Sequence, residues 1–265
     1  MPIKLATMQR KRKITTFRIK PSKANGFSSV VTNVAPPVLS LRINAFLLTT
    51  DVILSILRTE TVEVVGDLCR ALGPYIAKYC DKILFFLLND LQAQNLHRSV
   101  KPSILSCFGD IALAIEGQFE KYLPYALTML GSASDLSIQT QQVAADDDDM
   151  IDYNNALRNG ILEAYSGLFQ GFKSNKQQLS AFHDHAREII GFIESIYQDP
   201  NRSDSVTKNA VWVLGDLADT LENVGPFFAE KPFYQKFLME CKQDASLGET
   251  AQWALNRISM RGASL

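Results

Sequence analysis

The tetrapeptide VGDL occupies residues 65–68, and close variants of it return as FGDI at 108–111 and as LGDL at 214–217. A weaker fourth copy, YSGL at 165–168, lacks the aspartate. The first two copies begin 43 residues apart, and a period of about 40 to 50 residues is typical of stacked helical pairs. The repetition therefore indicates an array of similar units.

The apolar residues around these copies follow the period of an α-helix, because they recur every three or four positions. Three such stripes are Ile104, Phe108, Ile111 and Ile115; Ala210, Leu214, Leu217 and Leu221; and Leu247, Ala251, Leu255 and Ile258. A second helical stretch precedes the copies, at 83–91, 122–130 and 189–197. We predict an all-α fold, a HEAT/armadillo-type α-solenoid of about five helical pairs. The first pair is incomplete, and the fifth joins 226–240 to 247–258.

Charge is distributed unevenly along the chain. Residues 1–45 contain nine Lys and Arg and no acidic residue, whereas the remainder has 18 basic against 28 acidic residues, a net charge of about −10. Proline and glycine interrupt the first segment, so we predict a basic, mostly unstructured arm over 1–45 and a helical array over 46–265. The arm is either an inert solvated tail, a nuclear-localisation or nucleic-acid patch, a transit peptide or an RNA-binding tail.

Several functional classes are excluded by the composition. No stretch is long and apolar enough to span a bilayer, and the acidic body should repel nucleic acid and membrane surfaces and attract basic partners. Four isolated cysteines indicate a reducing compartment rather than a disulfide or zinc framework. We find no phosphate-binding loop or nucleophile motif. The sequence therefore predicts a protein that is not an enzyme and has no cofactor or metal.

An acidic insertion is predicted at 132–149, where the spacing between copies is longest. It ends in four consecutive carboxylates, Asp146, Asp147, Asp148 and Asp149. Acidic groups stabilise a helix N-terminus, so they can cap a helix that starts near Met150. The alternative is an acidic clamp for a ligand rich in Lys and Arg.

Helical geometry predicts which side chains face a partner. At 100° per residue, Trp212 and Asp216 lie opposite the apolar stripe of their helix, and Trp253 lies opposite the stripe of the last helix. Tryptophan stacks well on Arg and Lys, although a neighbouring repeat could cover it instead. Asp67, Asp110 and Asp216 share one helical position and predict a ladder of carboxylates on the inner surface. Alternatively, they make local hydrogen bonds or pair with basic residues of the next unit.

The run HRSVKPSILSCFGDIALAI at 97–115 closely resembles the C-terminal HEAT repeats of the importin beta family of nuclear import receptors. The run VGDLCRAL at 65–72, the stretch around 162–167 and the closing Trp253 and Ala254 resemble the same repeats, so the resemblance covers about residues 63–260.

The resemblance implies a superhelix that carries cargo through the nuclear pore and releases it when the GTPase Ran binds. It implies that these repeats bind the basic importin-beta-binding helix of importin alpha, or similar basic cargo, through acidic residues and tryptophans. Trp253 matches the family's tryptophan in its last repeats, and Asp67, Asp110 and Asp216 match its Gly-Asp positions. The expected locations are the cytoplasm, the nucleus and the pore. Ran and nucleoporin FG repeats are expected partners of the full-length family. The alternative is a generic HEAT scaffold or a truncated product without transport activity of its own.

Overall fold

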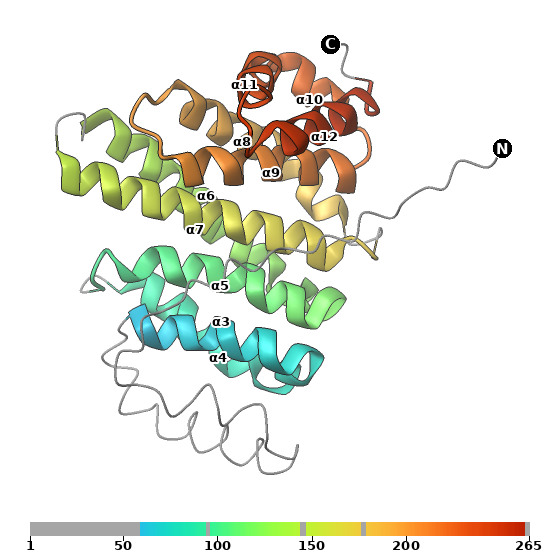
Figure 1. Ribbon diagram of the computed structural model, residues 1–265. Helices are drawn as coiled ribbons and strands as arrows, with labels where there is room; N and C mark the ends of the chain where they lie inside the picture. Colours follow the sequence, from blue (N-terminus) through green and yellow to red (C-terminus); the bar gives the residue numbers. More distant parts are fainter. Residues whose placement is uncertain (1–58, 94–95, 144–146, 176–178, 263–265) are drawn as a thin grey trace. The chain divides into compact units, whose positions relative to one another are not determined.

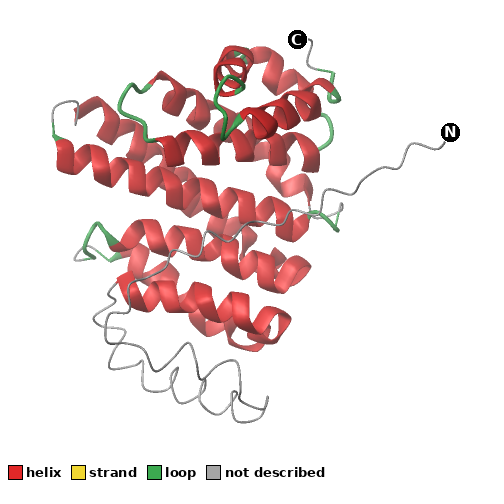
Figure 2. Ribbon diagram, in the orientation of Figure 1, coloured by secondary structure: helices red, strands yellow, loops and turns green. Residues whose placement is uncertain are grey.

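The computed structural model describes residues 59–262, apart from 94–95, 144–146 and 176–178. The chain divides into two units, Met1–Ile53 and Leu54–Leu265, and the described residues all belong to the second. Within these ranges the structure consists of helices and short turns and contains no strand (Figure 2). The basic arm predicted over 1–45, and its boundary with the array, lie outside the described residues.

The helices follow one another in pairs. In chain order they are α3 (Thr59–Leu72), the 3-10 helix η2 (Gly73–Ile76), α4 (Ala77–Gln92), α5 (Val100–Ile115), the 3-10 helix η3 (Glu116–Tyr122), α6 (Leu123–Val143), α7 (Asp148–Phe172), α8 (Ser180–Gln198), α9 (Asp204–Thr220), α10 (Gly225–Glu230), α11 (Phe233–Cys241) and α12 (Gly248–Ser259).

The pairs stack into two layers of helices (Figure 1). The second helix of each pair contacts the second helix of the next, so that α3, α5, α7, α9 and α12 form one layer, which we call the inner layer. The first helices, α4, α6, α8 and the short α10 and α11, pack against it. This arrangement confirms the predicted all-helical solenoid of stacked pairs.

The predicted apolar stripes form the core between the layers. Every residue of the three stripes in α5, α9 and the last helix is buried, including Phe108, Leu214 and Leu255. A single pair could not bury such a face, so each unit is stabilised by contact with its neighbours.

The segment predicted as an insertion is largely helical. Helix α6 continues to Val143 and α7 begins at Asp148, so residues 132–143 are helix and not loop. The buried hydroxyls of Ser134 and Thr140 donate to backbone carbonyls one turn earlier, at 2.9 Å and 2.8 Å. Such residues favour helices weakly, and the helix forms here because α6 packs on α7 and α8.

Helices α5 and α7 approach so closely that their backbones touch. A Cβ atom on Gly167 would lie 2.4 Å from the Cα atom of Gly109, a distance that real Cβ atoms essentially never show. Cβ atoms at two further α7 glycines would lie 2.3 Å and 2.5 Å from carbonyl oxygens of α5. We call these three positions, Gly160, Gly167 and Gly171, the glycine seam. Only glycine fits there without separating the two helices.

The next interface of the inner layer, between α7 and α9, is bridged by polar side chains. The Asn155 amide donates to the Asn201 carbonyl at 2.9 Å, and the Asn159 amide donates to the Ser205 hydroxyl, also at 2.9 Å. Asn201 lies just before α9, Ser205 lies in its first turn, and Lys173 after the end of α7 pairs with Asp219 near the end of α9, so α7 and α9 run parallel.

A buried ion pair joins α6, α7 and the turn between α8 and α9. Arg158 Nη1 donates to Asp199 Oδ2 at 2.7 Å, and the two side chains are only 1% and 8% exposed. The remaining guanidinium nitrogens donate to Ser137 Oγ at 3.2 Å and to Gln141 Oε1 at 2.9 Å. These hydrogen bonds offset the cost of burying the charges.

Asp90 in α4 predicts a distinctive pH dependence of stability. Its Oδ2 atom is buried and has no hydrogen-bond partner among the residues described, and burial raises the pKa of Asp90 to about 6. The folded state therefore binds a proton more tightly than the unfolded chain, and the Asp90 contribution to stability falls as pH rises from about 4 to 6. Because Asp90 is partly exposed and solvent screens its charge, we expect Asp90→Asn to raise the free energy of unfolding at pH 7.5 by about 1 kcal/mol and to change it little at pH 4. Urea titrations at the two pH values measure this difference.

Asp81 provides a control, because its contribution to stability should change with pH in the opposite direction. Its carboxylate accepts hydrogen bonds from Lys121 Nζ at 2.7 Å and from the Tyr122 hydroxyl at 2.6 Å, which lowers the pKa of Asp81. Its contribution is present at neutral pH and is lost as pH falls through the lowered pKa. Asp81→Asn should therefore destabilise at pH 7.5 and do so less at pH 4. A gain in stability for both variants at pH 7.5 would contradict the opposite pKa shifts of Asp90 and Asp81.

Candidate partner-binding surface

The two tryptophans of the chain lie side by side on the inner layer. Trp212 in α9 and Trp253 in α12 have ring centroids 5.5 Å apart and ring planes tilted by 51°. Both side chains are half-buried, so each keeps part of its surface accessible. The sequence placed each opposite an apolar stripe, and the structure brings the two together.

Gly215 makes this arrangement possible. A Cβ atom at this position would lie 2.0 Å from the Trp253 Cζ3 atom, so the indole lies directly on the backbone of α9. The neighbouring repeat therefore covers part of Trp253, which is one of the two alternatives that the sequence left open. Because the rest of the side chain is accessible, the other alternative, stacking on a cation, stays a prediction.

Glu249 is a candidate contact residue that sequence reasoning missed. It is exposed, lies in the first turn of α12 and precedes Trp253 by four residues. Side chains at that spacing lie on one side of a helix, so this carboxylate is on the side of α12 that carries Trp253. The i, i+4 spacing of Glu249 and Trp253 was the available signal.

Asp216 is not on the accessible surface, and this corrects the expectation that it faces a ligand. Its side chain is 6% exposed, and Oδ2 accepts hydrogen bonds from the Ser166 hydroxyl at 2.8 Å and from the Gln170 amide at 3.2 Å. The expectation was wrong because it considered a single apolar stripe. Helix α7 covers α9 on the side that carries Asp216.

The other two aspartates of the predicted ladder share one arginine. Arg70 donates to Asp110 Oδ1 at 2.8 Å and to Asp67 Oδ1 at 2.7 Å. Asp110 therefore reaches back to a residue of the preceding unit, as Asp216 does to Gln170. Asp110 and Asp216 therefore connect neighbouring units, whereas Asp67 pairs within its own helix and is the most exposed of the three, with 73% of its side chain accessible.

The acidic run before α7 caps that helix. Asp147 is the N-cap residue, and its Oδ1 accepts a hydrogen bond from the Met150 N–H at 3.2 Å. Asp148 and Asp149 lie in the first turn, and all three side chains are exposed. Asp146 lies outside the described residues. Capping is confirmed for Asp147, and the acidic clamp stays a prediction.

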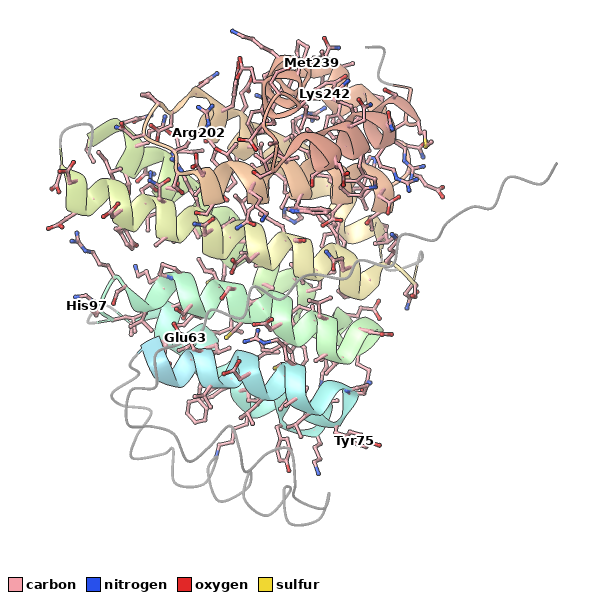
Figure 3. The ribbon with its side chains drawn as sticks, viewed as in Figure 1. Glu63, Tyr75, His97, Arg202, Met239 and Lys242 are labelled. Carbon is pink, nitrogen blue, oxygen red and sulfur yellow. The ribbon has the colours of Figure 1, made fainter. Side chains whose placement is uncertain are left out.

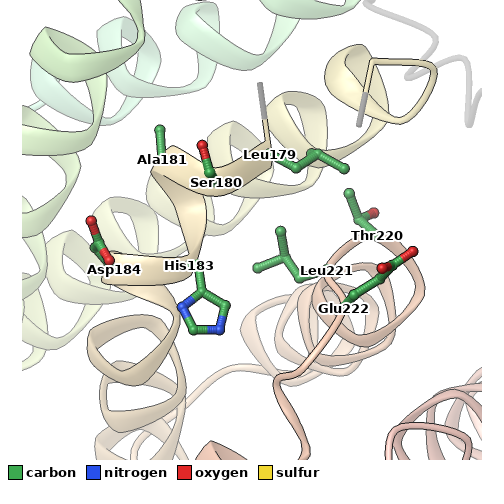
Figure 4. A pocket seen from close by; sticks show the side chains of 8 residues that line it. All are labelled: Leu179, Ser180, Ala181, His183, Asp184, Thr220, Leu221 and Glu222. Carbon is green, nitrogen blue, oxygen red and sulfur yellow. The ribbon is translucent and has the colours of Figure 1, made fainter. Parts of the chain in front are cut away.

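A pocket of about 550 Å³ lies between the start of α8 and the turn after α9 (Figure 4). It is lined by Leu179, Ser180, Ala181, His183, Asp184, Thr220, Leu221 and Glu222. The pocket contains none of the predicted partner-binding residues. The His183 ring packs 5.0 Å from Phe227, whereas His185 Nδ1 lies 3.0 Å from a Glu188 oxygen. The two histidines therefore do not form a common site.

The described part of the chain holds no group of three or more His, Cys, Asp or Glu side chains arranged for a metal. The described helices include none that is long and apolar enough to cross a membrane. All four cysteines are buried, and burial raises the pKa of Cys80 and of Cys107 to about 12. These thiols are therefore un-ionised at neutral pH.

The exposed apolar side chains of the described ranges do not form one patch. The large ones are Tyr75, Phe85, Tyr125, Val143, Met239 and Met260. Tyr75 and Met239 lie at opposite ends of the helical unit (Figure 3).

Comparison with known proteins identifies the family. Residues 49–242, most of the chain, match the family model described as importin subunit beta-1-like, TPR repeats. The chain belongs to the importin beta family. The resemblance inferred from the sequence motifs is confirmed.

Importin beta relatives are much longer than this chain. Importin subunit beta-1 of Arabidopsis thaliana is 50% identical over 204 residues, which are 75% of this chain and 23% of that protein. Importin subunit beta-1 of Schizosaccharomyces pombe is 43% identical over 159 residues, 60% of this chain and 18% of that protein. The chain spans about a quarter or less of the length of these relatives.

Solved importin beta structures show the same fold. A crystal structure of importin beta superposes with a TM-score of 0.69 at 31% identity, covering 78% of this chain and 24% of that one. Kap95 in its complex with Nup1 superposes with a TM-score of 0.71 at 21% identity, covering 86% and 26%. The second likeness is one of fold alone.

Cations gather around the C-terminal end of α9 in this importin beta array. Lys173, which follows α7, and Arg257 in the last turn of α12 pair with Asp219 of α9 at 2.5 Å and 3.1 Å. Arg261 donates to the backbone carbonyls of Ala218 and Asp219, where cations are favoured by the helix dipole.

Proposed function

We propose that this chain is the C-terminal region of a nuclear import receptor and that its inner layer binds a basic helix. The importin-beta-binding helix of importin alpha, or a basic cargo segment like it, fits this surface. The half-buried Trp212 and Trp253 pair, with exposed Glu249 one turn away, carries the proposal. A tryptophan face beside a carboxylate suits a cationic side chain and suits few other groups.

The charge of the array supports a basic partner. Residues 46–265 carry a net charge of about −10. Acidic residues are exposed in the first turns of α7 and α12, at Asp148, Asp149 and Glu249. Such a surface attracts a basic helix and raises its association rate, most strongly at low ionic strength.

Further partners are proposed on family membership. Kap95, which shares the fold, has been solved with RanGDP and with Nup1. We extend this to propose that Ran and nucleoporin FG repeats are partners of the longer receptor, which moves between cytoplasm and nucleus through the pore. A generic HEAT scaffold is the second candidate function, because the chain spans only 23% of its Arabidopsis relative.

Binding of a basic helix should depend on salt and on Trp253. We expect the full chain to bind a fluorescently labelled importin-beta-binding peptide more tightly at 50 mM than at 150 mM salt. Trp253→Ala should weaken binding by about 1 to 2 kcal/mol, because it removes an aromatic contact from the centre of the site. Fluorescence anisotropy titrations at both salt concentrations measure the two effects.

Phe85→Ala is the matched control for that experiment. Phe85 is also a large aromatic residue, 61% exposed, but it lies on α4 in the other layer. Its substitution should leave peptide affinity unchanged. If the folded, helical protein fails to bind, or binds with no response to salt or to Trp253→Ala, the generic scaffold is the better description.

A further inference from the structure

Gly215 lies beneath the Trp253 indole, where any side chain would collide with the ring. We propose that Gly215 is a positioning residue that fixes the tryptophan pair as a site for an arginine guanidinium in preference to a lysine ammonium. This inference rests on the proposed function, because it names the side chain of the basic helix that the pair recognises.

The contact between Gly215 and Trp253 is unusually close and specific. A Cβ atom at Gly215 would lie 2.0 Å from Cζ3 and 2.6 Å from both Cε3 and Cη2 of Trp253. All three atoms belong to the six-membered ring, so this ring occupies the space that a side chain at 215 would fill. The absence of a Cβ atom determines where the indole lies.

The backbone beneath the indole is held in place by α7. The next residue, Asp216, is buried and accepts hydrogen bonds from Ser166 and Gln170. Helix α9 therefore cannot easily move away from a new Cβ atom, and Trp253 must move instead. Its indole can do so by rotating about its two side-chain torsions.

This behaviour differs from that of the glycine seam. There the atoms that a Cβ would meet belong to the backbone, as at Gly167 against Gly109, and the helices themselves must separate. At Gly215 the opposing atoms are the end of one side chain. Gly215→Ala should therefore displace the indole and preserve the fold.

The geometry of the pair favours a guanidinium. Two indoles tilted by 51° at 5.5 Å are not stacked flat on one another, so they do not fully cover each other's faces. A guanidinium is planar and weakly hydrated, so it can stack on an indole while its N–H groups remain free to donate to a carboxylate such as that of Glu249. A lysine ammonium is strongly hydrated and has no planar face to stack. The site should therefore prefer arginine.

The test uses the full chain and its own tryptophans. Because Trp212 and Trp253 are the only two in the sequence, near-ultraviolet circular dichroism from indoles and tryptophan fluorescence report on this pair alone. We expect Gly215→Ala to change both signals and to leave the far-ultraviolet helical signal near that of the wild type. Affinity for an Arg-rich basic peptide should fall about tenfold. The wild-type preference for this peptide over its Lys-substituted version should fall towards one.

Gly191→Ala is the matched control, because it is the same change within a helix. The atoms nearest to a Cβ at Gly191 are the Lys231 Cε and Nζ atoms at 3.7 Å and 3.8 Å, which is ordinary contact. It should alter neither the tryptophan signals nor the affinity. The double variant Gly215→Ala/Trp253→Ala tests the route of the effect. With the indole removed, the added Cβ has room, so peptide affinity should equal that of Trp253→Ala.

The outcomes separate this inference from the proposed function. If the wild type binds no basic peptide but Gly215→Ala still changes the tryptophan signals, the proposed function and the arginine site are overturned and the positioning role stands. If the wild type binds and Gly215→Ala changes neither signal nor affinity, the positioning role is overturned. Equal affinity of the wild type for Arg and Lys peptides would overturn the preference for arginine. Additive effects in the double variant would show that Gly215 does not act through Trp253.

Discussion

Gly167→Ala should destabilise the array by about 3 kcal/mol or more, one of the two largest effects expected of a single substitution here. The new Cβ atom would lie 2.4 Å from the Cα and 2.7 Å from the carbonyl carbon and oxygen of Gly109. Backbone atoms cannot rotate away, so α5 and α7 must separate along the whole glycine seam. Urea denaturation followed by far-ultraviolet circular dichroism measures the loss.

Gly131→Ala gives the opposite sign and serves as the control. Gly131 lies within α6, and a Cβ atom there would have nothing within 4 Å. Alanine costs less conformational entropy than glycine in a helix, so this variant should be more stable by about 0.5 to 1 kcal/mol. A Gly167→Ala protein as stable as Gly131→Ala would show that the seam is not tightly packed.

Removing the buried arginine should be comparably damaging. Arg158→Met deletes the cation and leaves the Asp199 carboxylate buried beside an apolar chain, with the Asn201 N–H as a remaining donor at 2.9 Å. Breaking a buried ion pair by removing one partner costs about 3 to 5 kcal/mol. The same urea titration measures it, and α6 should be the helix that loses most hydrogen-exchange protection, because Ser137 and Gln141 lose their donor.

Two further variants distinguish lost pairing from lost packing. Arg158→Met/Asp199→Asn removes both charges and should recover part of the stability, since no buried charge is then left unpaired. Arg187→Met breaks a surface pair in which Arg187 donates two hydrogen bonds to Glu230, both at 2.9 Å. Exposed pairs contribute little, so this variant should be close to the wild type. A double variant less stable than Arg158→Met would contradict the explanation.

Local periodicity was sufficient to predict the stacked helical pairs and the buried stripes, although the stretch predicted as one helix at 226–240 is divided at Lys231 and Pro232 into α10 and α11. Residues such as Phe108 and Leu214 are buried in any array of helical pairs, because a helix with one apolar side must cover it. The continuation of α6 through Ser134 and Thr140 was not predictable in this way. Those residues favour helices weakly, and packing on α7 and the hydrogen bonds from Arg158 to Ser137 and Gln141 hold the segment in place.

The sequence predicted individual residues of the candidate site but not which of them contact one another. The sequence placed Trp212 and Trp253 away from their stripes, but their contact depends on the register between α9 and α12, which local spacing does not encode. The same limitation explains Asp216, whose burial comes from a neighbouring helix. Gly215 belongs to the repeated motif, yet its closeness to an indole required the three-dimensional arrangement.

The glycine seam also determines how the array can deform. Helices whose backbones touch cannot slide past each other by a fraction of a turn, so we expect the joint between α5 and α7 to be stiff. The joint between α7 and α9 is bridged by side-chain amides such as Asn155 and Asn159, which can exchange their partners for water at small cost. Buried Asp216 fixes this joint near the end of α9, so when a bound helix strains the array, the bending should concentrate at the start of α9, where these partly exposed amides lie. The helical pairs that contain α5 and α7 should then move together as one rigid body.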